Sequence, residues 1–223
     1  MRQIPLAIGA AAQRSFDTFL PGGNAQVLAH VRELPLRPTP LYLWSPAGSG
    51  KTHLLQALAA MVQAQGGRVA WFDADSATPW EFDSGAALIV FDDCDRYDAA
   101  RQQAAFALFV EATAHAIPIA AAARVPPVDL VMRDDLRTRL AWGHVFALEP
   151  LGEVDARAAL RREADRRAIF LSDDVMDYLL TRFARDLKHL MQLLDRLDEF
   201  SLATKRPITV PLLKRMLDEE GQP

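Results

Sequence analysis

The sequence predicts an α/β fold in which a doubly wound parallel sheet of five strands is followed by a small helical lid. Two observations predict it. Between residues 41 and 148, short apolar runs alternate with helical patterns, the order in which parallel strands and their crossover helices follow one another. After residue 150 only helical patterns remain, so this part of the chain is expected to add no strand.

Five short apolar runs mark the expected strands. The run at residues 86–91, Ala-Ala-Leu-Ile-Val-Phe, is continuously apolar, which is typical of a strand that is covered on both faces of a sheet. The other four strands are predicted at residues 41–44, 69–72, 117–123 and 145–148.

The spacing of apolar residues predicts the helices. In residues 52–65, five apolar side chains share one helical face, and the pair Gly66-Gly67 is expected to end that helix. Further helices are predicted within residues 16–31, at 99–115, and, beyond residue 150, at 155–168, 172–184, 186–204 and 210–219. These patterns divide the chain into a tail (1–14), a base domain (15–150) and a helical lid domain (151–223).

Composition limits the class of function. The formal net charge is −4, which argues against a general electrostatic attraction to DNA. The single cysteine, Cys94, excludes an internal disulfide, suits a reducing compartment and is expected to serve in packing. We find no pattern of a signal peptide and no apolar stretch of membrane-spanning length. A cytoplasmic protein without membrane contact is therefore expected.

A glycine-rich run lies between the first expected strand and the helix that follows it. Its members are Ser45, Pro46, Ala47, Gly48, Ser49, Gly50, Lys51 and Thr52. Glycines let the backbone approach phosphate oxygens closely, and a helix N-terminus attracts anions. Lys51 is expected to reach the β- and γ-phosphates, and the Thr52 hydroxyl to ligate Mg²⁺. The run predicts a nucleoside-phosphate site, although Ser45 stands where such loops usually begin with glycine.

Two carboxylates follow the expected strand at residues 86–91. Asp92 is predicted to hold Mg²⁺, directly or through water, and Asp93 to orient or deprotonate the attacking water. The alternative is a pair of solvated acids at a strand end. The nearby phosphate loop favours the first interpretation.

Together these residues resemble the AAA+ module of the DnaA family of bacterial replication initiators. The resemblance covers the chain from residue 15 onward and rests on the runs at 15–19, 23–24, 44–57, 92–93, 124–127 and 135–140. It implies an AAA+ fold that binds ADP or ATP with Mg²⁺. It also implies that Phe16, Asn24 and His53 contact the nucleotide beside residues 46–52 of the loop. For Phe16, plain core packing is an equal alternative.

The resemblance further implies roles for two basic residues. Lys188 matches the position of a sensor-2 arginine and is expected at the nucleotide. Arg139 matches the arginine finger that reaches the nucleotide of a neighbouring subunit. The alternatives are a surface ion pair for Lys188 and a solvated helix arginine for Arg139.

Two departures from the family pattern bear on hydrolysis. Residues 120–123 are four alanines, where the family normally has a polar side chain near the γ-phosphate. The lysine at position 188 is a point charge and lacks the bidentate fork of arginine. Both departures favour a protein that binds nucleotide and is at most a weak ATPase.

Two further features resemble a regulatory branch of the family. No pattern of the family's DNA-binding helix-turn-helix domain follows the lid. The first residues, with Gln3, Ile4, Leu6 and Ile8, resemble the short peptide that docks on the DNA polymerase sliding clamp; the alternative is a disordered tail. Such regulators act on the clamp, stimulate hydrolysis of DnaA-bound ATP and so prevent re-initiation.

The expected partners are therefore DnaA, the sliding clamp and a further copy of the chain, without sequence-specific DNA binding. The competing hypothesis is a DnaA-like ATPase or helicase loader that acts through its own ATP hydrolysis.

Overall fold

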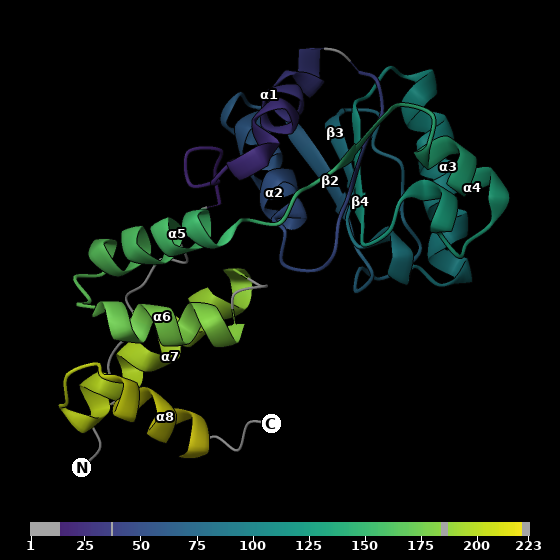
Figure 1. Cartoon of the computed structure of the whole chain (residues 1–223). Helices are drawn as coiled ribbons and strands as arrows, with labels where there is room; N and C mark the ends of the chain where they lie inside the picture. The colour runs from purple at the N-terminus through teal and green to yellow at the C-terminus, as the bar shows by residue number, and fades with distance from the viewer. Residues whose placement is uncertain (1–13, 37, 184–186, 220–223) are drawn as a thin grey trace.

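The computed structural model describes residues 14–36, 38–183 and 187–219 (Figure 1). Within them, five parallel strands form one sheet in the order β2-β3-β4-β1-β5. The strands are β1 (Leu41–Trp44), β2 (Arg68–Phe72), β3 (Ala86–Phe91), β4 (Ile119–Ala123) and β5 (His144–Ala147). The predicted doubly wound sheet of five parallel strands is confirmed.

Helices cover both faces of this sheet (Figure 1). On one face lie α1 (Ala25–Glu33) and α2 (Lys51–Ala64), and on the other lie α3 (Ala99–Ala114) and α4 (Asp134–Leu140). The apolar pattern did not predict α4 as a separate element. This helix has only seven residues, too few for helical spacing to stand out in the sequence.

Successive residues of each strand point to opposite layers. In β1, Leu41 and Leu43 pack with α1 and α2, whereas Tyr42 packs with α3 and α4. In β4, Ala120 and Ala122 face the first layer, and the intervening alanine faces the second. The sheet is therefore buried on both sides, as its apolar runs predict.

The C-terminal part is helical, as predicted. Its helices are α5 (Glu153–Arg166), α6 (Asp173–Phe183), α7 (Leu187–Thr204) and α8 (Val210–Glu219). Their buried side chains form a hydrophobic cluster of their own, separate from the two clusters that flank the sheet. No helix among the described residues is long and apolar enough to cross a membrane.

The element boundaries agree with the sequence patterns to within about two residues. Gly66, with φ +82°, ends α2 as predicted, and the Ser172 hydroxyl accepts a hydrogen bond from the Val175 N–H at the start of α6. Strand β4 begins two residues later than predicted because Pro118 has no N–H to donate to a sheet. Short 3-10 helices occupy Gly22–Asn24, Leu34–Leu36, Cys94–Arg96 and Pro127–Asp129.

Candidate nucleotide-binding site

The glycine-rich loop connects the carboxyl end of β1 to the amino end of α2. Gly48 and Gly50 adopt positive φ angles of 82° and 94°, which glycine reaches without steric penalty. A Cβ on Gly50 would also lie 2.8 Å from Cε2 of Phe19. Ser45 does not adopt a positive φ, so a serine is tolerated where glycine is usual. The loop backbone therefore has the conformation that its glycines predict.

Lys51 is folded back into this loop. Its Nζ donates hydrogen bonds to the carbonyl oxygens of Ser45 (2.7 Å) and Pro46 (3.0 Å), and a weaker one to the Ser45 hydroxyl (3.3 Å). The Pro46 carbonyl also accepts a bond from the Ser49 hydroxyl at 3.1 Å, while Ala47 is exposed at the tip. The ammonium is thus held at a helix N-terminus whose first N–H groups have no partner within the helix, an arrangement that fits phosphate.

Lys51 is only 6% exposed. Burial lowers the pKa of Lys51, and the nearby carboxylates, Asp92 first among them, oppose that shift. A buried ammonium of this kind is stabilised when an anion replaces the water it has lost.

Asp92 and Thr52 come together as the sequence predicts for a magnesium site. Asp92 is 4% exposed, and burial raises its pKa, an effect that a hydrogen bond with the Thr52 side chain opposes. One residue comes from the end of β3 and the other from the first turn of α2. A hydroxyl and a carboxylate in contact are the oxygen ligands that Mg²⁺ takes beside nucleotide phosphates.

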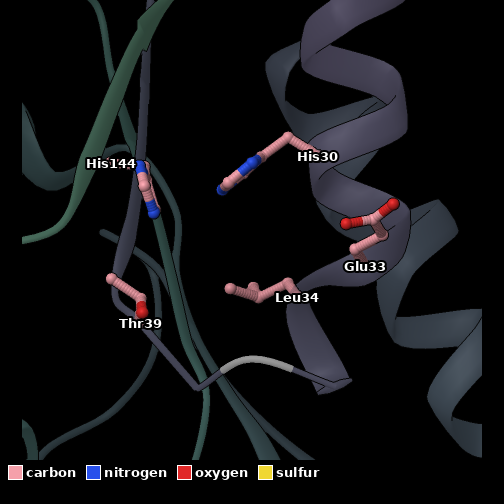
Figure 2. A pocket seen from close by; sticks show the side chains of 5 residues that line it. All are labelled: His30, Glu33, Leu34, Thr39 and His144. Carbon is pink, nitrogen blue, oxygen red and sulfur yellow. The ribbon is translucent and has the colours of Figure 1, made fainter.

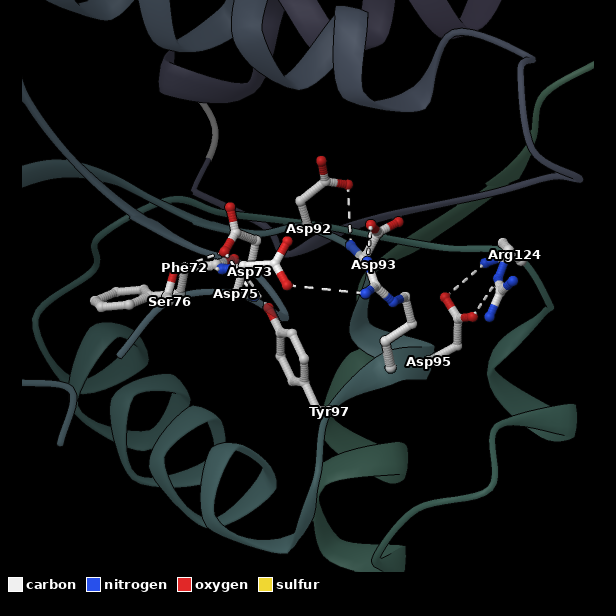
Figure 3. Close-up of polar contacts among 10 residues, drawn as sticks. Phe72, Asp73, Asp75, Ser76, Asp92, Asp93, Asp95, Tyr97 and Arg124 are labelled. Atoms are coloured by element: carbon white, nitrogen blue, oxygen red, sulfur yellow. Dashed lines mark hydrogen bonds and ion pairs between the residues drawn. The ribbon is translucent and has the colours of Figure 1, made fainter. Parts of the chain in front are cut away.

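Asp93 has a different environment. Its backbone is left-handed, with φ +51°, and its N–H donates to Oδ1 of Asp92 at 3.0 Å. Its own carboxylate accepts a hydrogen bond from Arg96 at 3.3 Å, and Arg96 also lies 3.8 Å from a carboxylate oxygen of Asp75 (Figure 3). The expected catalytic acid is therefore ion-paired in this structure.

The residues of the site include an ion pair that the sequence did not predict. Arg124 directly follows β4, and its backbone N–H and Nε donate to the two carboxylate oxygens of Asp95, at 3.1 and 2.6 Å (Figure 3). In the sequence, nothing beyond the position of Arg124 after four alanines pointed to this ion pair. The Ser45 N–H bonds the Ala123 carbonyl at 3.3 Å, so Arg124 lies at the sheet edge that carries the loop.

The N-terminal segment is attached to α2 through His53. Its Nε2 lies 3.0 Å from the Ser15 carbonyl and 3.2 Å from the Thr18 hydroxyl, and the edge of its ring meets Phe19 with the ring centroids 5.5 Å apart. Burial lowers the pKa of His53, and the bond to Ser15 opposes the shift. A neutral ring that donates from Nε2 fits this environment.

Two protein-family models match parts of the chain. The family described as bacterial DnaA ATPase domain matches residues 11–82, which include the loop and the segment held by His53. The family described as Hda, lid domain, matches residues 153–217, the helices α5 to α8. The chain is a AAA+ protein of the Hda/DnaA type.

Solved structures show the same fold. Domain III of the replication initiation protein DnaA from Thermotoga maritima matches with a TM-score of 0.81 and 20% identity, over 95% of this chain and 98% of that one. AMPPCP-bound DnaA from Aquifex aeolicus matches with a TM-score of 0.74 and 20% identity, over 94% and 70% of the two chains. The RuvB Holliday junction branch migration motor of Thermotoga maritima matches with a TM-score of 0.68 and 16% identity, over 92% and 72%.

Two other expected nucleotide contacts of this Hda/DnaA-type protein make protein contacts here. Phe16 is half-buried against the cluster of α1 and α2, with the Arg32 guanidinium 5.2 Å from its ring centroid. Asn24 is 3% exposed. Its amide donates to the Glu149 carbonyl and accepts from the Glu149 N–H, both at 2.8 Å. Nucleotide contact by Phe16 and Asn24 stays a prediction.

Arg139 lies in α4, on the opposite face of the sheet from the loop helix α2. Its guanidinium lies 5.2 Å from the ring centroid of Trp142, and it has no ion pair within the described part of the chain. Arg137 differs, because it is paired with Asp134 at 2.8 Å.

The remaining predicted site residues are not described in full. The backbone of Lys188 lies in the first turn of α7, and its side chain is outside what the structure describes. Gln3, Ile4, Leu6 and Ile8 lie outside the described residues. Cys94 is buried, with burial raising its pKa, which agrees with a packing role.

A cavity of about 260 Å³ lies between α1 and β5, lined by His30, Glu33, Leu34, Thr39 and His144 (Figure 2). His144 is the first residue of β5 and pairs with Leu41, the first residue of β1. The cavity is therefore at the amino ends of these strands, whereas ligands of parallel α/β sheets bind at the carboxyl ends. It is not the phosphate site.

Proposed function

We propose that this chain binds an adenine nucleotide with Mg²⁺ and, from the sliding clamp, stimulates hydrolysis of the ATP that DnaA holds, which prevents re-initiation of replication. The chain's own nucleotide would lie against the loop, with Lys51 at its phosphates. Thr52 and Asp92 would hold Mg²⁺, which neutralises phosphate charge when bound. This nucleotide serves as a ligand that stabilises the base and lid domains.

One observation supports the proposal that Arg139 acts on the ATP held by another protein molecule. Arg139, on the face of the sheet opposite α2, forms no ion pair with a carboxylate of the described residues, whereas Arg137 and Arg133 are each paired with an aspartate. An arginine that is free of carboxylates can make bidentate bonds to phosphate oxygens. Arginine fingers supplied by a partner accelerate phosphoryl transfer by about 10³–10⁵.

The alternative is an ATPase that turns over its own nucleotide. The presence of Asp93 beside Asp92 favours this alternative, because such an acid can orient the attacking water. Two observations oppose it. Asp93 is paired with Arg96, and the side chains of residues 120–123 are buried methyl groups without a polar atom for the γ-phosphate.

The test compares two arginines of one helix. DnaA is loaded with labelled ATP, and single-turnover hydrolysis is followed with clamp-loaded DNA and this protein. Arg139→Ala is expected to lose at least about 10²-fold of the stimulation, within the range for such arginines, while its own ADP affinity is retained. Arg137→Ala, which removes an exposed ion pair, serves as the matched control and should lose little.

Full stimulation by the Arg139 variant would refute the role of that residue. Steady-state ATPase of the chain alone addresses the alternative: rapid turnover that disappears in Asp93→Asn would favour an enzyme acting on its own nucleotide. Binding to the sliding clamp is tested separately, by replacing Gln3 and Leu6 with alanine.

A further inference from the structure

Trp142 contacts Arg139 without being part of the core. The ring is 62% exposed, and the guanidinium carbon of Arg139 lies 5.2 Å from its centroid. The two residues are three positions apart, across the C-terminal end of α4. A tryptophan exposed to this extent lacks the burial that usually explains this residue type.

The backbone at Trp142 is closely held. Its N–H donates to the Arg139 carbonyl at 3.1 Å, and two residues later the His144 N–H donates to the Pro40 carbonyl at 2.8 Å. Between them, a Cβ on Gly143 would collide with the Pro40 carbonyl, so glycine is required there. The start of β5 and the end of α4 are thereby fixed together, and the indole ring projects from a backbone that cannot easily shift.

The chemistry of the contact suits a charge that must remain available. A carboxylate partner occupies the N–H donors of a guanidinium, as Asp135 occupies those of Arg133 at 2.7 and 2.6 Å. An aromatic face attracts the cation through its π electrons and leaves the donors at the guanidinium edge unbonded. Stacking therefore restricts the side chain while preserving its capacity for phosphate.

We infer that Trp142 is a positioning residue that holds the Arg139 guanidinium ready for a phosphate group on another protein molecule. This inference rests on the proposed function for its catalytic consequence. The stacking itself does not depend on DnaA, so the two parts are measured separately.

The first measurement uses the isolated chain. In a ¹⁵N-labelled sample, the Nε–Hε resonance of Arg139, assigned by its loss in Arg139→Lys, is expected to move when Trp142→Leu removes the ring current. Trp142→Phe keeps an aromatic face and should retain part of the displacement. An unchanged Arg139 resonance in Trp142→Leu, with the fold intact by circular dichroism, overturns the inference whatever DnaA does.

The second measurement is single-turnover hydrolysis of DnaA-bound ATP at increasing concentrations of each variant. Trp142→Leu is expected to lower the maximal rate by about 10-fold, within the loss that misplacement of a catalytic group causes, with less than about a twofold change in the half-saturating concentration. Trp142→Phe should recover most of the rate. A change confined to the half-saturating concentration would make Trp142 a docking residue and overturn the inference.

A double variant separates positioning from an independent effect. Residues that act through one another are not additive, so Trp142→Leu combined with Arg139→Ala should be no slower than Arg139→Ala alone. A further 10-fold loss in the double variant overturns the inference. If Arg139→Ala keeps full stimulation while the Arg139 resonance still moves in Trp142→Leu, the proposed function fails and the stacking contact stands.

Discussion

Asn24 provides the sharpest test of how the N-terminal segment is used. Its amide donates to the Glu149 carbonyl and accepts from the Glu149 N–H, both at 2.8 Å, across 125 residues of sequence. Although Asn24 is the residue before α1, its side chain makes no capping bond to that helix. Asn24→Ala therefore removes a long-range contact and leaves helix capping unchanged.

The size of the effect follows from this geometry. Each removed hydrogen bond leaves a backbone group of Glu149 without its partner at a site where Asn24 is 3% exposed. A buried polar group left unpaired costs about 1–3 kcal/mol, and partial access to water reduces the sum for two groups to about 2–4 kcal/mol. For a chain of this size, 1 kcal/mol shifts the melting temperature by roughly 2–4 °C. The expected decrease is therefore about 4–16 °C.

The assay is thermal and urea unfolding without nucleotide, followed by ADP titration. Gln26→Ala, an exposed position in α1, is the matched control and should stay within about 0.5 kcal/mol of the parent. Asn24→Asp keeps the acceptor but loses the donor and buries a charge, so it should be at least as unstable as Asn24→Ala. If Asn24→Ala is as stable as the parent and yet binds ADP weakly, the amide serves the nucleotide and the structural reasoning is wrong.

Three further predictions concern the loop, its neighbour and the tail. Lys51→Ala should weaken ADP binding at least about tenfold, or 1.4 kcal/mol, in isothermal titration; equal affinity would remove the central claim. Burial lowers the pKa of His53 in the folded protein, so the stability gained by burying the neutral ring is complete above the unfolded pKa of about 6.5 and is lost as pH falls through the folded pKa. The fall in melting temperature from pH 7.5 to 5 should accordingly be smaller in His53→Gln, and identical profiles would contradict it. Replacing Gln3 and Leu6 by alanine should abolish clamp binding in surface plasmon resonance with ADP affinity unchanged; unchanged clamp affinity would leave the tail without that role.

Local sequence patterns predicted most of the fold because the relevant physics is local. Continuous apolar runs marked strands buried on both faces, and the glycines of residues 48–50 marked a loop that needs positive φ. The meeting of Thr52 and Asp92 was also predictable, since the carboxyl ends of all strands in a parallel sheet lie at one edge, even though β4 separates β3 from β1.

Long-range side-chain partners could not be predicted in this way. The resemblance predicted that Asn24 contacts the nucleotide, and nothing in the residues around Asn24 predicts its hydrogen bonds to Glu149. The ion pair of Arg124 was not predicted either, although residues 124–127 match the family pattern. Its partner Asp95 lies 29 residues away, and only the pairing of β3 with β4 brings them together.

The two buried charges of the site lead to a last prediction, that the proposed nucleotide binds together with Mg²⁺. Burial shifts both pKa values toward the neutral forms, downward for Lys51 and upward for Asp92, so both charged forms are destabilised by the loss of water. Phosphate oxygens alone would stabilise the ammonium of Lys51 but would repel the carboxylate of Asp92. A divalent cation between Thr52 and Asp92 would reverse that repulsion and restore the charged form of the acid. We therefore expect the protein to bind a nucleotide–magnesium complex more tightly than the free nucleotide, and this preference should disappear in Asp92→Asn.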